Sequence, residues 1–65
     1  MKYKIEIWQY HSLTDTYESN DIKDILDWYR VHWRYCYEIG GCSFSVYKYD
    51  EELSFEEEHD LGFYS

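Results

Sequence analysis

The sequence lacks several features that mark common classes of small protein. It has no proline, and no proline-rich linker, repeat or low-complexity segment divides it. Its only cysteines are Cys36 and Cys42, whereas a small secreted domain usually carries four or more. We therefore interpret both cysteines as reduced, core-facing thiols of a cytoplasmic protein.

Long apolar runs are absent as well. No segment approaches the roughly 18 consecutive apolar residues that a membrane-spanning helix needs. Lys2, Lys4 and Glu6 interrupt the segment that follows Met1, which argues against a signal peptide. The sequence therefore predicts a protein without a membrane span.

Positive charge is scarce and unevenly placed. Six Lys and Arg residues face fourteen Asp and Glu residues, for a net charge of −8. Residues 50–65 hold seven of the acids and no Lys or Arg. Because direct nucleic-acid binding needs a basic surface, this distribution excludes nucleic acid as a direct partner and favours a basic protein surface.

Aromatic residues are abundant instead. Tyr, Trp and Phe make up 23% of the 65 residues. A chain of this length buries only about 60% of its unfolded surface, so we expect one domain, residues 1–65, whose small core is closed by aromatic rings. Fifteen rings exceed what that core can hide, which favours a homodimer or another partner surface.

Residues 19–41 show the clearest helical periodicity. Ser19 or Asn20 is expected to cap the N-terminus, with Asp21 in the first turn. Gly40 and Gly41 are expected to end the helix in the left-handed conformation. The apolar stripe that should face the core consists of Ile22, Ile25, Leu26, Tyr29, Trp33, Cys36 and Tyr37.

Two other segments alternate as half-buried strands do. In residues 2–10, Tyr3, Ile5 and Ile7 are expected to face the core and Trp8 the opposite side. Residues 11–15 should form a turn and residues 16–18 a short returning strand. In residues 42–49, the core-facing set is Cys42, Phe44 and Val46.

The last segment leaves two interpretations open. After a turn at residues 50–51, residues 52–55 can pair as an edge strand, or Ser54 can cap a short helix. Ser54 and Glu57 form a capping-box pattern, and Gly62 is placed to end such a helix. A brief strand near Leu53 followed by one or two helical turns is favoured. Both interpretations leave Phe55 available for packing.

These segments together predict the fold class. We expect an α+β fold with one main helix packed on a small antiparallel sheet. The order is β-β-α-β-β, or β-α-β-β with a short C-terminal helical turn.

The acidic run at residues 50–60 is the leading candidate for a binding surface. Carboxylates three or four residues apart on a helix lie about 5–6 Å from each other, comparable with the roughly 7 Å between phosphates along an extended DNA strand. The alternative is a solvated surface that only keeps the protein soluble. The expected contacts are Asp50, Glu51, Glu52, Glu56, Glu57, Glu58 and Asp60.

A second acidic series recurs at every third position and consists of Asp15, Glu18, Asp21, Asp24 and Asp27. Its part on the main helix, Asp21, Asp24 and Asp27, lies away from the core stripe. It is a candidate extension of the same anionic surface. Compensation of the helix dipole is the alternative explanation, and it accounts well for Asp21 and Asp24.

A possible aromatic interface involves Trp8, Trp28 and Tyr35. Trp28, Val31 and Tyr35 form a second row on the helix, and Trp8 and Tyr10 come from the first strand. Such a patch would suit a dimer interface or a binding hot spot. The alternative is a helix buried on two sides.

Catalysis and metal binding have little support in the sequence. His11, His32 and His59 do not have zinc-ligand spacing. No nucleophile elbow, glycine-rich phosphate loop or Cys–His arrangement is present. We expect no catalytic residues, no cofactor and no metal site.

In type, the chain resembles small acidic accessory proteins of bacteriophages, including anti-CRISPR proteins and other DNA mimics. The resemblance lies in the short chain, its net charge, the acidic run at residues 50–60 and the segment RVHWRYCYEIGG. It implies an inhibitor that acts in the host-cell cytoplasm. Such an inhibitor would occupy the basic nucleic-acid-binding surface of a host defence protein, with a Cas9-type nuclease favoured.

Two further hypotheses come from other classes. The first is a small homodimeric interaction or regulatory module that uses the aromatic patch. The second is a metal-binding module, suggested only by the carboxylates around His59.

Overall fold

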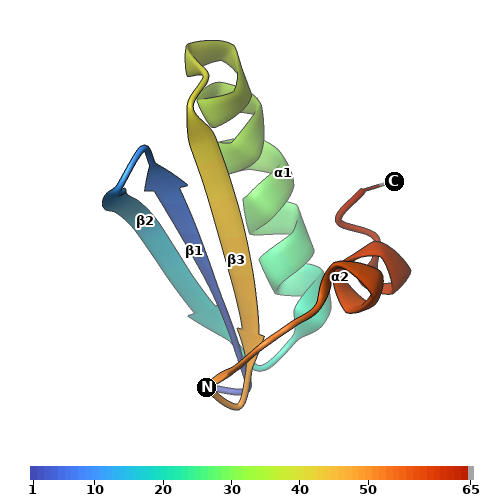
Figure 1. Ribbon diagram of the computed structural model, residues 1–65. Coiled ribbons are helices and arrows are strands. Elements are labelled where there is room, and N and C mark those ends of the chain that lie inside the picture. The colour runs from blue at the N-terminus through green and yellow to red at the C-terminus, as the bar shows by residue number, and fades with distance from the viewer. Residues whose placement is uncertain (65) are drawn as a thin grey trace.

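The computed structural model describes residues 1–64, apart from the side chains of Tyr37 and Ile39. In this part of the chain four strands form one antiparallel sheet in the order β2-β1-β3-β4, accompanied by two helices. Figure 1 shows β2, β1 and β3 side by side, with α1 packed behind them. The predicted α+β fold is confirmed. The elements in chain order are β1 (Tyr3–Gln9), β2 (Ser12–Ser19), α1 (Ile22–Ile39), β3 (Cys42–Lys48), β4 (Glu51–Glu52) and α2 (Phe55–Leu61).

The core lies between one face of the sheet and the two helices. Alternation along β1 places Tyr3, Ile5 and Ile7 on this face, and all three side chains are buried. Ile5 pairs with Val46 of β3 and with Tyr17 of β2, so one layer crosses three strands. The opposite face of the sheet carries Lys4, Glu6 and Trp8 from β1, each only partly covered.

Helix α1 buries the predicted stripe against this layer. Ile25, Leu26, Tyr29 and Cys36 are buried, and Ile22 and Trp33 pack at the border of the core. The side chain of Tyr37, the last member of the predicted stripe, lies outside the described part of the structure. Gly40 has φ +82° and Gly41 has φ +70°, so both adopt the expected positive φ at the helix end.

The N-terminal cap of α1 differs from the prediction. Asp21 is the cap, and its Oδ1 accepts a hydrogen bond of 3.0 Å from the amide of Lys23. Asn20 instead accepts a bond from the amide of Lys2, and the hydroxyl of Ser19 accepts one from the amide of Asp21. The two expected caps therefore satisfy other backbone groups.

Strand β2 is longer than the sequence predicted. It begins at Ser12, and the connection from β1 shortens to Tyr10 and His11, where Tyr10 has φ +56°. Thr14, read as a turn former, sits at a register irregularity opposite Ile7 and Trp8. Its hydroxyl donates to the carbonyl of Ile7 at 3.0 Å, which ties the irregular stretch to β1.

The turn between β3 and β4 also lies one residue earlier than predicted. Tyr49 and Asp50 connect the paired residues Lys48 and Glu51, and both central residues have positive φ, +51° and +68°. Two successive residues in this conformation are typical of a type I′ hairpin turn, which matches the twist of the flanking strands. The edge strand is consequently only Glu51–Glu52.

Helix α2 follows the capping-box prediction. The hydroxyl of Ser54 accepts a bond from the amide of Glu57, and the Glu57 carboxylate accepts one from the amide of Ser54. Gly62 ends the helix with φ +103°. Leu53 before the helix and Phe63 after it are both buried in the core, so α2 is anchored at its two ends.

Candidate functional site

The unpaired carboxylates gather over the β3–β4 turn and α2. Five exposed acids in this region form no hydrogen bond or ion pair with any described residue. We call this set the acidic surface. It consists of Asp50, Glu51, Glu52, Glu56 and Asp60.

The other two carboxylates of the predicted set have structural roles. Glu57 is exposed but belongs to the capping box of α2. Glu58 is 8% exposed, so its predicted place on the exposed anionic surface is wrong. It is the third residue in a run of three glutamates, and the turn of the helix directs it toward the core rather than to solvent.

The electrostatics of Glu58 follow from this burial. Desolvation raises the pKa of Glu58, while a hydrogen bond of 3.2 Å from the hydroxyl of Tyr64 lowers it in part. Burial, together with the charge and the hydrogen bond of Glu58, raises the pKa of Tyr64. Nearby, burial raises the pKa of Tyr29 to about 12. The underside of α2 is therefore a low-polarity environment, in contrast to its outer side.

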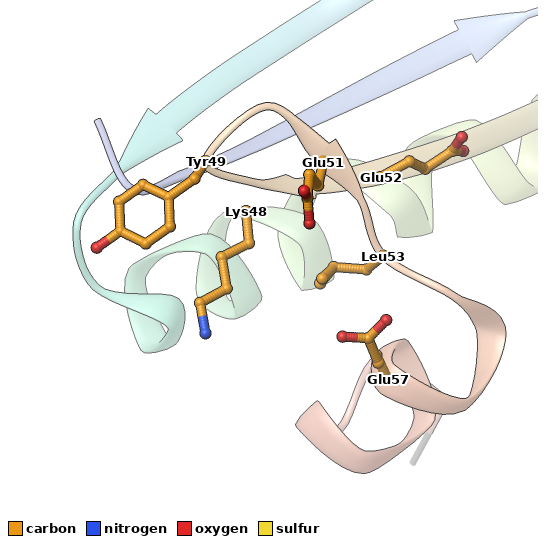
Figure 2. A pocket seen from close by; sticks show the side chains of 6 residues that line it. All are labelled: Lys48, Tyr49, Glu51, Glu52, Leu53 and Glu57. Atoms are coloured by element: carbon orange, nitrogen blue, oxygen red, sulfur yellow. The ribbon is translucent and has the colours of Figure 1, made fainter.

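An open groove separates β4 from α2. Its lining residues are Lys48, Tyr49, Glu51, Glu52, Leu53 and Glu57. Figure 2 shows Glu51 and Glu57 pointing toward Leu53 from opposite sides, while Glu52 points away. Lys48 is the one cation that lines this groove. Three carboxylates and one ammonium group thus line this groove, so its local charge is negative.

An exposed aromatic side chain accompanies the carboxylates. Phe55 at the start of α2 is 65% exposed, although both interpretations of the sequence left it available for packing. Its ring lies 4.8 Å from that of Tyr64 and 6.4 Å from that of His59, measured between centroids. Leu53 and Phe63 already fill the space beneath α2, so Phe55 stays outside between Glu56 and Asp60, with which it lines a shallow hollow.

The acids of α1 behave differently from those of the acidic surface. Asp21 is the helix cap, and Asp24 accepts a hydrogen bond of 2.7 Å from the hydroxyl of Tyr17. Asp27 lies 3.7 Å from a guanidinium nitrogen of Arg30. Each of these three acids has a local partner, unlike the five acids of the acidic surface, but all three remain exposed. Only Asp21 acts at the helix terminus itself.

The predicted aromatic interface does not form one patch. Trp8 lies on the sheet face opposite α1, where it lines a shallow hollow with Tyr10 and Tyr47. Trp28 lies on α1, stacked between Tyr17 at 5.4 Å and His32 at 4.1 Å. Because the sheet separates Trp8 from α1, the prediction that Trp8 joins Trp28 in one surface is wrong.

The remaining row on α1 is nevertheless exposed. Val31 is 70% exposed and Tyr35 is 69% exposed, next to the half-buried Trp28. A helix buried on two sides is thus excluded for this row. Val31 and Tyr35 are free to contact a partner.

The thiols and imidazoles form no metal-binding group in the described part of the chain. Cys36 and Cys42 are free thiols, and burial together with a hydrogen bond to Cys42 raises the pKa of Cys36 to about 11. Cys36 is therefore protonated at neutral pH and a weak nucleophile. Among residues 1–64, no three His, Cys, Asp or Glu side chains converge in a geometry that would hold a metal ion.

The acidic surface was visible in the sequence, but its composition was not. The run of acids could be counted directly, whereas the burial of Glu58 depends on Tyr64, whose contact follows only from the three-dimensional fold. None of the helices in the described residues combines the length and apolar character needed to cross a membrane. Comparisons with protein-family models, curated proteins and solved structures find no match to this chain.

Proposed function

We propose that this protein is a non-enzymatic inhibitor that binds the basic nucleic-acid-binding surface of a DNA-handling host defence protein. A Cas9-type nuclease is the favoured target. The observation that carries the proposal is the acidic surface, five exposed carboxylates without a partner in the described chain. No Lys or Arg follows Lys48 in the sequence to neutralise them.

The energetics favour binding over a purely solubilising role. Clustered like charges repel each other and cost stability, and solubility needs only a net charge distributed over the surface. A surface built to hold DNA presents Arg and Lys side chains toward phosphates and the PAM. The acidic surface is complementary to it, so the inhibitor would compete with DNA for the same cations.

The rigid attachment of α2 and β4, which carry the carboxylates, supports the same function. The capping box, buried Leu53 and buried Phe63 hold α2 against the core, and the tight turn at Tyr49 and Asp50 holds β4. A preorganised surface loses less conformational entropy on binding. Phe55 adds an exposed aromatic side chain among the charges, a residue type that is enriched at protein interfaces.

The proposal implies a defined setting. The protein would be of bacteriophage type and act in the cytoplasm of the host cell. It would bind no nucleic acid directly and need no cofactor, because its contribution is the shape and charge of one surface.

A DNA-binding competition tests this function. Guide-loaded Cas9-type nucleases from several subtypes are mixed with labelled target DNA and increasing amounts of the protein. We expect DNA binding by at least one nuclease to fall, and the inhibition to weaken about tenfold or more between about 0.05 and 0.3 M salt. Unchanged DNA binding for all nucleases would contradict the choice of target, and salt-independent inhibition would contradict the electrostatic mechanism.

A second candidate function has one specific observation in its favour. Val31 and Tyr35 are exposed on α1 beside Trp28, as expected for a small homodimeric interaction or regulatory module. Sedimentation at two concentrations tests it. A concentration-dependent dimer that Tyr35→Ala dissociates would support the module, and a monomer at both concentrations would contradict it.

A further inference from the structure

Strand β2 forms the long free edge of the sheet. It is the first strand in the order β2-β1-β3-β4, and among the described strands it pairs only with β1 (Figure 1). It has eight residues, of which six are exposed and two partly buried. The other edge, β4, has only two residues and leads directly into α2.

The edge of β2 lacks the usual protection against pairing. Natural edge strands are commonly blocked by Lys or Pro, or covered by a helix or loop. The strand SLTDTYES contains neither residue type. One irregularity lies near Thr14, and residues 15–19 continue in regular register with β1. These five residues present alternate backbone donors and acceptors to solvent, as β-augmentation requires.

The side chains that border this edge are acidic on both faces of the sheet. Asp15 pairs with Ile7 and so lies on the face that α1 covers, while Glu18 pairs with Lys4 and lies on the open face. Asp24 stands above the strand, held by the hydroxyl of Tyr17. No Lys or Arg occurs between residues 5 and 22.

A stack of three aromatic rings lies beside these carboxylates. The rings of Tyr17 and Trp28 are parallel within 4° at 5.4 Å, and His32 continues the stack. Because Trp28 lies between the other two rings, the methylene stem of a lysine or arginine would pack on the outer face of Tyr17, and its cationic head would gain cation–π attraction there. The neighbouring carboxylate of Asp15 or Asp24 would then receive the charge.

We propose that the β2 edge binds an extended peptide segment rich in lysine and arginine by adding it to the sheet as a fifth strand. Backbone hydrogen bonds to residues 15–19 supply the pairing, and the acids on both faces select a basic side-chain pattern. A second copy of this chain fits poorly, because each copy carries a net charge of −8 and pairing would bring the acids of two β2 strands together. This interface is separate from the acidic surface and goes beyond the proposed function.

The test uses a defined probe. An acetylated, amidated eight-residue peptide of valine and threonine, with two lysines on each face, is titrated into the isotopically labelled protein. Backbone amide signals and hydrogen exchange are recorded. We expect perturbation and slowed exchange at residues 15–19. Perturbation confined to α2, or no binding, would overturn the proposal.

N-methylated peptides separate strand pairing from simple charge attraction. In the first peptide, N-methylation of the alternate amides that would face β2 blocks the hydrogen bonds to this strand. In the second peptide, N-methylation of the other alternate amides, in the opposite phase, leaves those hydrogen bonds intact. We expect one phase to lose binding and the other to retain it. Equal binding by both peptides would overturn the proposal, because an electrostatic contact does not depend on the phase.

A charge-matched pair of protein variants tests the selection of basic peptides. The variant Asp15→Asn/Glu18→Gln should bind the lysine peptide about two- to thirtyfold more weakly, as loss of two exposed ion pairs implies. The variant Asp27→Asn/Glu38→Gln removes the same charge elsewhere and should bind like the wild type. If the two variants bound the lysine peptide with equal affinity, the proposed selection of basic peptides by Asp15 and Glu18 would be overturned. A concentration-dependent dimer paired through β2 would show the second copy to be the occupant, and would also overturn the proposal.

Discussion

The hydroxyl of Tyr64 donates a hydrogen bond of 3.2 Å to Oε1 of Glu58, the one acid of the run at residues 50–60 that is buried. This contact divides α2 into two sides. Glu58 points toward Tyr64 and the core, while Glu56 and Asp60 face solvent. One short acidic helix therefore contains both a carboxylate that costs stability and carboxylates available to a partner.

Replacing Glu58 by Gln should stabilise the protein at neutral pH. Because burial raises the folded-state pKa of Glu58 above the ordinary 4.5, the folded state holds the proton more tightly than the unfolded state. The contribution of Glu58 to the free energy of unfolding is therefore present at low pH and is lost as the pH rises through the folded-state pKa of Glu58. We expect Glu58→Gln to raise the free energy of unfolding at pH 7 by on the order of 1 kcal/mol.

Urea unfolding over a pH series measures this effect. The advantage of Glu58→Gln over the wild type should shrink as pH falls toward about 4.5. Glu56→Gln is the matched control, since it removes the same charge from an exposed site and should change stability by less than about 0.5 kcal/mol. A destabilised Glu58→Gln protein at pH 7 would show that the ionised carboxylate is favourable where it lies.

Substitutions in the turn between β3 and β4 should raise the stability of the protein. Tyr49 and Asp50 both have positive φ, which costs roughly 1 kcal/mol or more for residues other than glycine. Tyr49→Asn/Asp50→Gly supplies the preferred residues of a type I′ turn and should raise stability by about 1 kcal/mol. Thermal unfolding measures it, with Asp50→Asn as the control for charge. A lower melting temperature for the double variant would show that the turn is not strained.

The capping box should be the main local support of α2. Ser54→Ala removes the acceptor for the amide of Glu57 and should cost about 1 kcal/mol. Glu57→Gln keeps the box, because glutamine can accept the bond from the amide of Ser54, and should cost much less. Chemical unfolding and amide exchange in α2 compare the two. Equal stability of Ser54→Ala and wild type would refute the cap.

The contact between Tyr17 and Asp24 should be visible in a titration. The hydrogen bond to Asp24, followed by burial and the charge of Asp24, raises the pKa of Tyr17 above 10.0. Asp24→Asn should bring the pKa of Tyr17 back toward that value, while Asp27→Asn should leave it unchanged. Ring-carbon chemical shifts of Tyr17 report the titration. An equal pKa in the wild type and both variants would mean that the bond does not form in solution.

Local patterns in the sequence predicted much of the fold. The capping box at Ser54 and Glu57 and the glycine stop at Gly62 depend on neighbours within four residues, so they could be predicted directly. The cap of α1 could not, because three candidates stand side by side and the choice depends on distant partners. Asn20 is drawn to the amide of Lys2, which leaves Asp21 to cap the helix.

Other errors came from residues whose local and tertiary roles differ. Ser12 and Thr14 have turn chemistry, but both lie in β2. Ser12 pairs with Gln9 of β1, and Thr14 is the unpaired residue of the irregularity, bonded through its hydroxyl to Ile7. The position of Trp8 was predictable from the alternation along β1. Ile5 and Ile7 lie on the face of the sheet that the helix covers, and alternation places Trp8 on the opposite face. The burial of Glu58 had no local signal, since it depends on Tyr64 and on the space beside Tyr29.

A comparison of two charge-matched variants tests the acidic surface most directly. Glu51→Gln/Glu52→Gln/Glu56→Gln/Asp60→Asn removes four charges from the acidic surface, and Glu18→Gln/Asp24→Asn/Asp27→Asn/Glu38→Gln removes four from β2 and α1. Both are assayed for inhibition of DNA binding by the nuclease that the wild type inhibits. We predict that the first variant loses inhibition by at least about 100-fold, while the second inhibits within a few fold of the wild type. Equal loss in both variants, or retained inhibition in the first, would contradict a function located at the acidic surface.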